Sequence, residues 1–325
     1  MTKYVTQTIE PWMPLGALKA KADYATIASY SGWQVLPIER YNDTRFDNQI
    51  LHDKIKHWLS KVQSKDVVIH QFPSYMSKNF ELSFVNMLHH LDIKSAVLIH
   101  DIEPLRLEKT FVWEFELLKK YDTVIVHSEA MKARLQEAGV STNYIIQPFF
   151  DYLGKTPTLA TYNKSINFAG TFQKSPWLQN PLAFSINLFG SIPKKWQNIE
   201  LPQNINYCGN FDPEDIVEQL QGGFGLIWDS DFEDKTYQTY TKYNTPHKAS
   251  LYLKAGLPLI AWKESEIGKL IVKFNIGFVI SNLDDIPDII AHTSSNQFAL
   301  WQKNILPLRS NISEGINTQN TLAQL

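Results

Sequence analysis

The stretch "DTVIVHSEAMKARLQEAGVSTNYIIQPF", residues 122–149, holds two short apolar runs on either side of a polar segment of helical length. Ser128 can cap the start of that helix, and Gly139 stands where a helix end favours a left-handed residue. The runs at 122–128 and 143–149 therefore predict two strands joined by a helix. Such a unit is typical of a parallel sheet that helices cover on both faces.

The same alternation extends in both directions from this stretch. Upstream lie "DVVIHQF" (66–72), "KSAVLIHD" (94–101) and a helical segment at 109–121. After a polar, turn-prone stretch at 151–165, a second series of apolar runs follows. These runs are "SINFAG" (165–170), "FSINLFG" (184–190), "INYCGN" (205–210), "GFGLIWD" (223–229), "LPLIAW" (257–262) and "GFVIS" (277–281). The pattern predicts two doubly wound α/β domains.

The domain boundaries follow from these two series. We predict an N-terminal domain at 1–155, a C-terminal domain at 156–306, and a closing helical segment at 307–325. Pro307 is expected to break that segment, which could cross back to the N-terminal domain. Because ligands of such sheets bind outside the carboxyl ends of the strands, we expect a ligand cleft between the two domains.

Composition limits the function classes. The chain has 325 residues and a net charge of −2, so no basic field favours nucleic acid or a membrane surface. Its single cysteine, Cys208, excludes an internal disulfide and favours a reducing compartment. No apolar run approaches the ~20 residues of a membrane helix, and the first residues lack the apolar core of a signal peptide. We predict a soluble cytoplasmic protein. The basic stretch 54–65 either packs on the first sheet or contacts a membrane.

The most informative motif is "YNTPHKASLYLKAGLPLI" (243–260). Pro246 is expected to open a helix, because a proline at the first turn loses no hydrogen bond. The free amide groups of that helix start, together with Lys248, would suit a diphosphate. Asn244 and Thr245 supply polar side chains just ahead of it. The alternative is a solvated lysine on an ordinary helix.

The segment "WDSD" (228–231) follows an apolar strand and resembles the D-x-D metal motif of single-domain glycosyltransferases. Its place after the fourth strand of its domain argues against metal binding. Asp229 could contact a donor sugar, or the segment could be an ordinary turn. The chain has no G-x-G-x-x-G after a strand, no P-loop, no H-E-x-x-H and no cysteine cluster.

In the first domain, polar residues follow two neighbouring strands. "LIHDIEPLR" (98–106) places His100, Asp101, Glu103 and Arg106 beyond a strand end, and "HQFPSY" (70–75) does so one strand earlier. Titratable groups gathered at the carboxyl edge of a sheet are candidates for a functional site. Such residues also form ordinary turns, and His100 could be a hydrogen-bonded core residue.

Taken together, "LIHDIEPLR", "INFAGTFQKSPWL", "GGFGLIWD" and "YNTPHKASLYLKAGLPLI" resemble the accessory glucosyltransferases, or third glycosyltransferases, of serine-rich adhesin glycosylation in Gram-positive bacteria. The resemblance spans nearly the whole chain. It implies a GT-B fold, a UDP-glucose or UDP-GlcNAc donor, and an acceptor GlcNAc on serine or threonine of a serine-rich adhesin. It also implies a homotetramer that needs no metal.

The resemblance also implies site residues. Asn244 and Lys248 would contact the phosphates, Lys174 in "FQKSPW" would lie near the nucleotide, and Tyr207 would lie against the uracil or ribose. Gly16, in the first loop, would let the backbone approach the donor. One departure is Leu251, which stands where many GT-B enzymes carry a ribose-binding glutamate.

Sugar transfer needs stabilisation of the departing UDP and removal of a proton from the acceptor hydroxyl. Lys248, Asn244 and the helix start would provide the first, and Asp101 is the first candidate base, with Glu103 and His100 behind it. In a retaining reaction, Asp101 would only orient the acceptor. The alternatives are a non-catalytic subunit that binds glycosylated acceptor, a GT-B transferase acting on polysaccharide or lipid-linked sugar, and a sugar-nucleotide epimerase.

Overall fold

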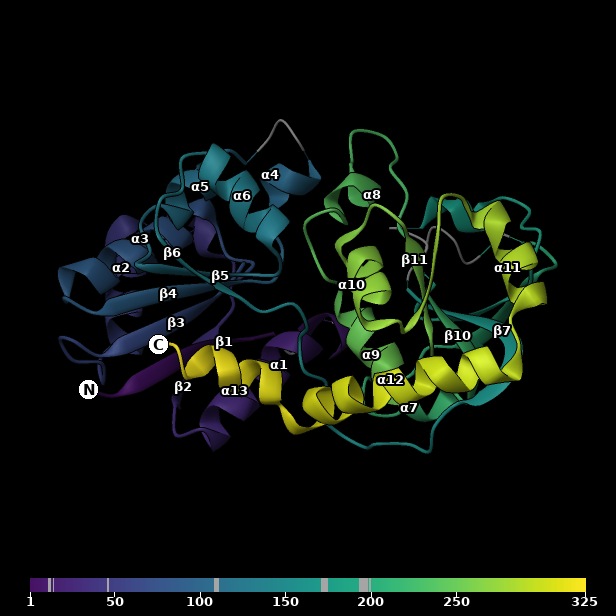
Figure 1. Cartoon of the computed structure of the whole chain (residues 1–325). Coiled ribbons are helices and arrows are strands. Elements are labelled where there is room, and N and C mark those ends of the chain that lie inside the picture. Colours follow the sequence, from purple (N-terminus) through teal and green to yellow (C-terminus); the bar gives the residue numbers. More distant parts are fainter. Residues whose placement is uncertain are drawn as a thin grey trace. The chain divides into compact units, whose positions relative to one another are not determined.

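The computed structural model describes residues 1–10, 13, 15–45, 47–107, 111–170, 175–192, 198 and 200–325 (Figure 1). The chain divides into two compact units. Unit 1 comprises Met1–Pro148 together with Asn317–Leu325, and unit 2 comprises Phe149–Ile316. Within the described ranges, no helix is both long enough and apolar enough to cross a membrane.

Unit 1 is built on a parallel sheet of six strands in the order β2-β1-β3-β4-β5-β6. The strands are β1 (Lys3–Ile9), β2 (Gln34–Glu39), β3 (Val67–Phe72), β4 (Lys94–Ile99), β5 (Thr123–Val126) and β6 (Asn143–Ile146). Every residue of β3 is buried, which explains its nearly continuous apolar sequence. The sequence pattern had predicted four of these strands. It missed β1, where polar residues interrupt the run, and β2, an edge strand that contains Pro37.

The helices of unit 1 connect these strands. They are α1 (Leu15–Tyr30), η1 (Asp43–Arg45), α2 (Asn48–Trp58), α3 (Lys78–His90), α4 (Glu103–Arg106), α5 (Trp113–Leu118), α6 (Glu129–Glu137) and α13 (Ile316–Leu322). The predicted N-cap Ser128 is confirmed, because its Oγ accepts the amide of Met131 at 3.0 Å. The basic stretch begins within α2, which buries Leu51 and Ile55 and packs against α3 and β2.

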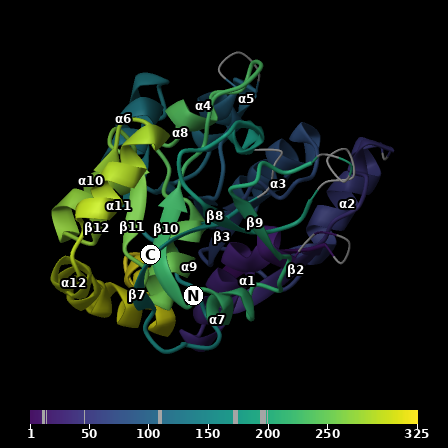
Figure 2. The ribbon, with the colours of Figure 1, turned by 90° about the vertical axis from the view of Figure 1, so that its right-hand side faces the viewer.

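Unit 2 has a second parallel six-stranded sheet, in the order β12-β11-β10-β7-β8-β9. Its strands are β7 (Thr161–Ala169), β8 (Ile186–Phe189), β9 (Ile205–Gly209), β10 (Gly222–Ile227), β11 (Leu259–Trp262) and β12 (Gly277–Ile280). All six predicted strands are therefore confirmed, and β10 and β11 can be seen side by side (Figure 2). The two sheets with their covering helices confirm the predicted α/β fold class.

The helices of unit 2 are mostly short. They are η3 (Pro176–Gln179), α7 (Ile216–Gln219), α8 (Tyr237–Tyr240), α9 (His247–Ala255), α10 (Glu266–Phe274), η5 (Leu283–Asp285), α11 (Ile286–His292) and α12 (Ser295–Glu314). The apolar side of α9 lies in the unit's core, where Leu251, Tyr252 and Leu253 are buried. This packing holds the start of α9 near the carboxyl ends of the strands β7 and β10.

The predicted helix break at Pro307 is wrong, because α12 continues through it to Glu314. Pro307 is exposed, so the carbonyl that its missing amide leaves unbonded can be hydrated. Ile305 and Ile312, on either side of it, are buried in the core of unit 2. The chain instead breaks at Gly315, whose φ of +77° places it in the left-handed conformation that favours glycine.

Candidate functional site

Helix α9 begins just after Pro246, which occupies the N-cap position with φ −69° and ψ 143°. Proline has no side-chain acceptor, so the N-cap side chain makes no hydrogen bond to the first amides of this helix. Those amides carry the partial positive charge of the helix start. At the other end, Gly256 adopts φ +79° and turns the chain toward β11. The predicted helix and its ends are confirmed.

Lys248, in the first turn of α9, is not a freely solvated lysine. Its Nζ lies 3.4 Å from Oδ1 of Asp229 and 4.8 Å from the centre of the Phe168 ring. Both charged side chains are only 18% exposed. Asp229 follows β10 and Phe168 lies near the end of β7. The ammonium group is therefore held at the carboxyl ends of these two neighbouring strands.

The strands β7 and β10 mark the topological switch point of unit 2. From β7 the chain proceeds to β8 and β9 on one side, and β10 then pairs with β7 on the other. Ligands of open α/β sheets bind outside the carboxyl ends of the strands at this point. The structure brings Lys248, Asp229 and the first turn of α9 together there.

Asn244 and Thr245 lie directly before this helix start. Thr245 is 2% exposed, and the Oδ1 atom of Asn244 is buried without a hydrogen-bond partner among the described residues. Asn244 and Asp229 line a cavity of about 10 Å³, which is room for one water molecule. Besides Pro246, the other lining residues are Ile227, Gln238, Thr241, Trp262, Ser265 and Ile267. This buried amide oxygen needs a hydrogen-bond donor, which a water molecule or a polar ligand can supply.

The two aspartates of the D-x-D segment have different partners. Asp231 accepts the amide of Gln238 at 2.7 Å and the hydroxyl of Thr239 at 3.2 Å, so it holds the start of α8. Asp229 instead faces Lys248. In the described part of the chain, no group of three or more histidine, cysteine, aspartate or glutamate side chains could hold a metal ion.

The remaining nucleotide candidates are more dispersed. Tyr207 lies on the edge strand β9, is 39% exposed, and donates its hydroxyl to the carbonyl of Gly190 at 2.9 Å. Gly16 lies in the first turn of α1 and not in a loop, and nothing lies within 4 Å of where its Cβ would be. Leu251 is a core residue of α9. Lys174 falls outside the described residues.

In unit 1, three of the four candidates after β4 form one cluster, and His100 has a different partner. Arg106 lies 3.0 Å from Asp101 Oδ2 and also forms an ion pair with Glu103. His100 Nε2 lies 2.9 Å from Gln71 Oε1. Because the Gln71 amide nitrogen donates to the carbonyls of Thr6 and Lys21, its Oε1 is an acceptor, and His100 Nε2 therefore carries the proton.

Sequence reasoning missed Glu114, which lies behind this cluster. Glu114 Oε2 accepts the amide of Glu103 at 2.8 Å, and the side chain is almost wholly buried. Burial, followed by the neighbouring carboxylates of Glu103 and Glu81, raises the pKa of Glu114 to about 8. The signal in the sequence was a glutamate inside the apolar segment "FVWEFELL".

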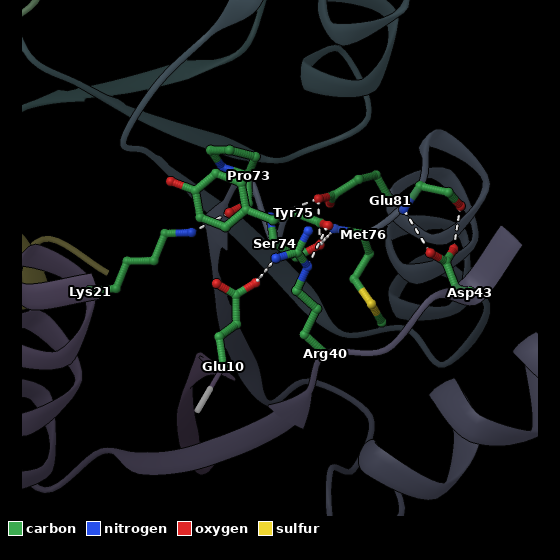
Figure 3. A network of polar contacts seen from close by, with 10 residues as sticks. Glu10, Lys21, Arg40, Asp43, Pro73, Ser74, Tyr75, Met76 and Glu81 are labelled. Atoms are coloured by element: carbon green, nitrogen blue, oxygen red, sulfur yellow. Dashed lines mark hydrogen bonds and ion pairs between the residues drawn. The ribbon is translucent and has the colours of Figure 1, made fainter. Parts of the chain in front are cut away.

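Sequence reasoning also missed a polar network at the ends of β1, β2 and β3 (Figure 3). Arg40 lies 2.7 Å from Glu10 Oε1, and its Nε donates to the carbonyl of Tyr75 at 2.9 Å. The ammonium group of Lys21 donates to the carbonyl of Pro73 and lies 4.1 Å from the centre of the Tyr75 ring. Burial lowers the pKa of Lys21 to about 8, against the opposing effect of Glu81, Glu10 and Asp101. Only the segment 70–75 had been singled out.

Comparison with known proteins gives the family. Residues 2–149 match the glucosyltransferase 3-like N-terminal domain, and residues 166–325 match the glucosyltransferase 3-like C-terminal domain. The chain is 28% identical over 313 residues to glucosyltransferase 3 of Streptococcus gordonii, covering 94% of this chain and 92% of that one. It is also 28% identical over 323 residues to the beta-1,6-galactofuranosyltransferase WbbI of Escherichia coli K12, covering 94% and 93%.

Solved structures confirm the fold. A structure of trehalose-6-phosphate synthase from E. coli, bound with UDP-2-fluoro glucose, aligns with a TM-score of 0.64 at 8% identity, and the alignment covers 100% of this chain and 98% of that one. This likeness confirms the GT-B architecture of two α/β units. The protein is therefore a glycosyltransferase of GT-B fold, and it belongs to the glucosyltransferase 3-like family.

Proposed function

We propose that the protein is a hexosyltransferase that moves glucose from UDP-glucose to a GlcNAc already attached to serine or threonine of a serine-rich adhesin. The observation that carries the donor side is the position of Lys248 in the first turn of α9, beside Asp229 at the switch point of unit 2. The names of the relatives, glucosyltransferase 3 among them, support transfer of glucose. UDP-GlcNAc is the second candidate donor.

In this proposal, unit 2 holds the donor. Lys248, Asn244 and Thr245 bind the diphosphate with the first amides of α9, where the ammonium group and the helix end neutralise the departing UDP. Asp229 lies beside Lys248 and contacts the donor sugar. Tyr207 and Lys174 bind the nucleoside, and Gly16 lets the backbone approach the donor, because it has no side chain in the way. The ribose must be held by residues other than Leu251, which is buried in the core.

Unit 1 binds the acceptor in this proposal. Asp101 takes the proton of the acceptor hydroxyl, or orients that hydroxyl if the reaction retains configuration. Arg106 holds the Asp101 and Glu103 carboxylates in place through its two ion pairs, and His100, which precedes Asp101 in the chain, is held by Gln71. These groups form a cluster of hydrogen-bond donors and acceptors for sugar hydroxyls. We further propose a cytoplasmic homotetramer that needs no metal.

The test is incubation with a panel of UDP-sugars and a serine peptide that carries GlcNAc, with the product read by mass. Added mass of one hexose from UDP-glucose supports the proposal. Transfer to the unmodified peptide, or no transfer from any UDP-sugar in the panel, contradicts it. A calorimetric titration with UDP separates an enzyme that lacks its acceptor from a non-catalytic subunit, because the latter releases no heat.

A second candidate function is transfer to a carbohydrate chain, either a polysaccharide or a lipid-linked sugar. It is favoured by the identity to the galactofuranosyltransferase WbbI, which equals that to glucosyltransferase 3 of S. gordonii. The panel should therefore include UDP-galactofuranose and a free oligosaccharide acceptor. Faster transfer to the oligosaccharide than to the glycopeptide would favour this alternative.

A further inference from the structure

We propose that the Tyr75 ring is the platform on which unit 1 holds the acceptor sugar, a neutral pyranose; this inference rests on the proposed function. Tyr75 follows β3, and Glu10 follows β1. These strands mark the switch point of unit 1, because the chain places β2 on one side of β1 and β3 on the other. The carboxyl ends of strands at a switch point are where sheets of this class bind ligands.

The backbone of Tyr75 is held in an unfavourable conformation. Its φ of +61° lies in the left-handed region, which a bulky side chain rarely adopts. Such a conformation persists only where the surroundings impose it, and it is common at ligand sites. No glycine stands here to relieve the strain, although glycine would adopt this φ freely. Tyrosine at this position therefore carries a conformational cost that glycine would not.

Buried polar groups impose this conformation from both sides of Tyr75. The Glu81 carboxylate accepts the amide and the hydroxyl of Ser74 at 2.8 and 2.7 Å, and it lies 3.0 Å from His70 Nε2. Glu81 and His70 are both essentially inaccessible to solvent. Arg40 and Lys21 donate to the carbonyls of Tyr75 and Pro73 (Figure 3). Burying these charges costs free energy, because each buried charge loses its hydration. A role in shaping a surface turn alone would not offset that cost.

The groups around the ring suit a neutral sugar better than an anion. Arg40 pairs with Glu10, and Arg106 pairs with Asp101 and Glu103, so both arginines are balanced by carboxylates. The third cation, Lys21, lies against one side of the ring and donates to the Pro73 carbonyl. Alternating donors and acceptors beside an aromatic face match the hydroxyl and C–H groups of a pyranose. Burial, followed by the Asp101 carboxylate, raises the pKa of Tyr75 to about 12, so the phenol stays a hydrogen-bond donor. The Asp101 and Arg40 side chains are each 29% exposed, which leaves polar atoms within reach of a ligand.

Three variants test the platform: Tyr75→Phe, Tyr75→Ala and Tyr75→Gly. The phenylalanine variant keeps the ring, and its KM for the GlcNAc peptide should stay within about threefold of the wild type. The alanine and glycine variants lose the ring, and that KM should rise roughly tenfold or more in both. The glycine variant should unfold at a higher denaturant midpoint than the alanine variant, because glycine relieves the strain. The affinity for UDP, measured by calorimetry, should not change.

The controls separate the effect of losing the Tyr75 ring from effects of backbone conformation and of donor binding. Lys65 also has a positive φ, +69°, but lies before β3 at the opposite end of the strand, so Lys65→Gly should leave the peptide KM unchanged. Wild-type KM in Tyr75→Ala, or rescue of the KM by Tyr75→Gly alone, would overturn the platform. Direct titration of the wild type and the Tyr75 variants with the GlcNAc peptide, without UDP, keeps this test independent of the donor. Failure of the wild type to bind UDP would instead count against the proposed function.

Discussion

The ammonium group of Lys248 lies 3.4 Å from Oδ1 of Asp229, in a position where each side chain is 18% exposed. The lysine is thus positioned by another side chain of the protein. A positioned cation needs no rearrangement to stabilise a departing diphosphate, which is the condition under which such groups contribute most.

Lys248→Ala should lower kcat by roughly 10²–10³-fold, the range found when one charge-stabilising group is removed from an active site. The fold should survive, because the side chain lies at the edge of the core. Steady-state kinetics with UDP-glucose and a UDP titration check both effects. Lys269→Ala is the matched control, since Lys269 is an exposed lysine in the first half of α10 that pairs with Glu266. Full activity with unchanged UDP affinity would refute the phosphate role of Lys248.

Asp229→Asn should separate the two roles proposed for that residue. The change removes the negative charge next to Lys248, so UDP should bind as well as in the wild type or more tightly. If Asp229 also contacts the donor sugar, kcat/KM for UDP-glucose should fall while UDP affinity is retained. Calorimetry with UDP and kinetics with UDP-glucose give the two quantities. Weaker UDP binding would show that Asp229 is needed to position Lys248 and that its charge does not compete with the diphosphate.

Asp101→Asn tests the acceptor base. A lost general base typically lowers turnover by roughly 10²–10⁴-fold, and the asparagine oxygen can still accept from Arg106. We therefore expect low turnover at every pH with normal UDP affinity. Asp92→Asn is the control, because Asp92 is exposed and pairs with Lys65 at the other end of the sheet. If Asp101→Asn turns over like the wild type across the pH range, the proton goes to another group.

Local patterns in the sequence predicted the features that depend on neighbouring residues. Continuous apolar runs predicted strands that are buried on both faces, such as β3, and Gly256 marked the end of α9. The polar network at the ends of β1, β2 and β3, which includes Glu10, Arg40 and Tyr75, could not be predicted in this way. Arg40 and Tyr75 are 35 positions apart in the sequence, and Glu10 lies farther from Tyr75 still. The three residues meet only because β1 lies between β2 and β3. The strand order is a property of the folded sheet, and no local periodicity encodes it.

Lys254, in the last turn of α9, shows the same limit, because its local sequence does not predict that it is buried. It is fully buried, and its ammonium group donates to the carbonyls of Tyr152 and Gly154 at 2.6 and 2.9 Å. Lys254→Met should destabilise the protein by about 1–3 kcal/mol, because two buried carbonyls lose their donor. The donor site should be spared, so UDP affinity should hold at temperatures where the variant is folded. Urea unfolding and a UDP titration check this. Unchanged stability would show that the carbonyls find another donor.

Glu114 gives a prediction about pH. Its pKa is raised from 4.5 to about 8 in the folded protein, chiefly by burial. As the pH rises from about 4.5 to about 8, the unfolded chain loses this proton while the folded chain keeps it, so the unfolded state binds fewer protons and stability falls. The fall from this group is at most about 1.4 kcal/mol per pH unit. Glu114→Gln cannot ionise and keeps an oxygen for the Glu103 amide, so it should gain stability over the wild type as the pH rises.

The measurement is the urea midpoint of the wild type and Glu114→Gln at pH 5, 6, 7 and 8, and the difference between them should widen steadily. Glu116→Gln is the matched control, because Glu116 lies on the same helix with its side chain 63% exposed. It should show no such trend. If the stability difference between Glu114→Gln and the wild type stays constant with pH, Glu114 ionises in the folded protein with its ordinary pKa. The Glu103 amide, which leads into the helix carrying Arg106, would then be held by a carboxylate throughout the working range.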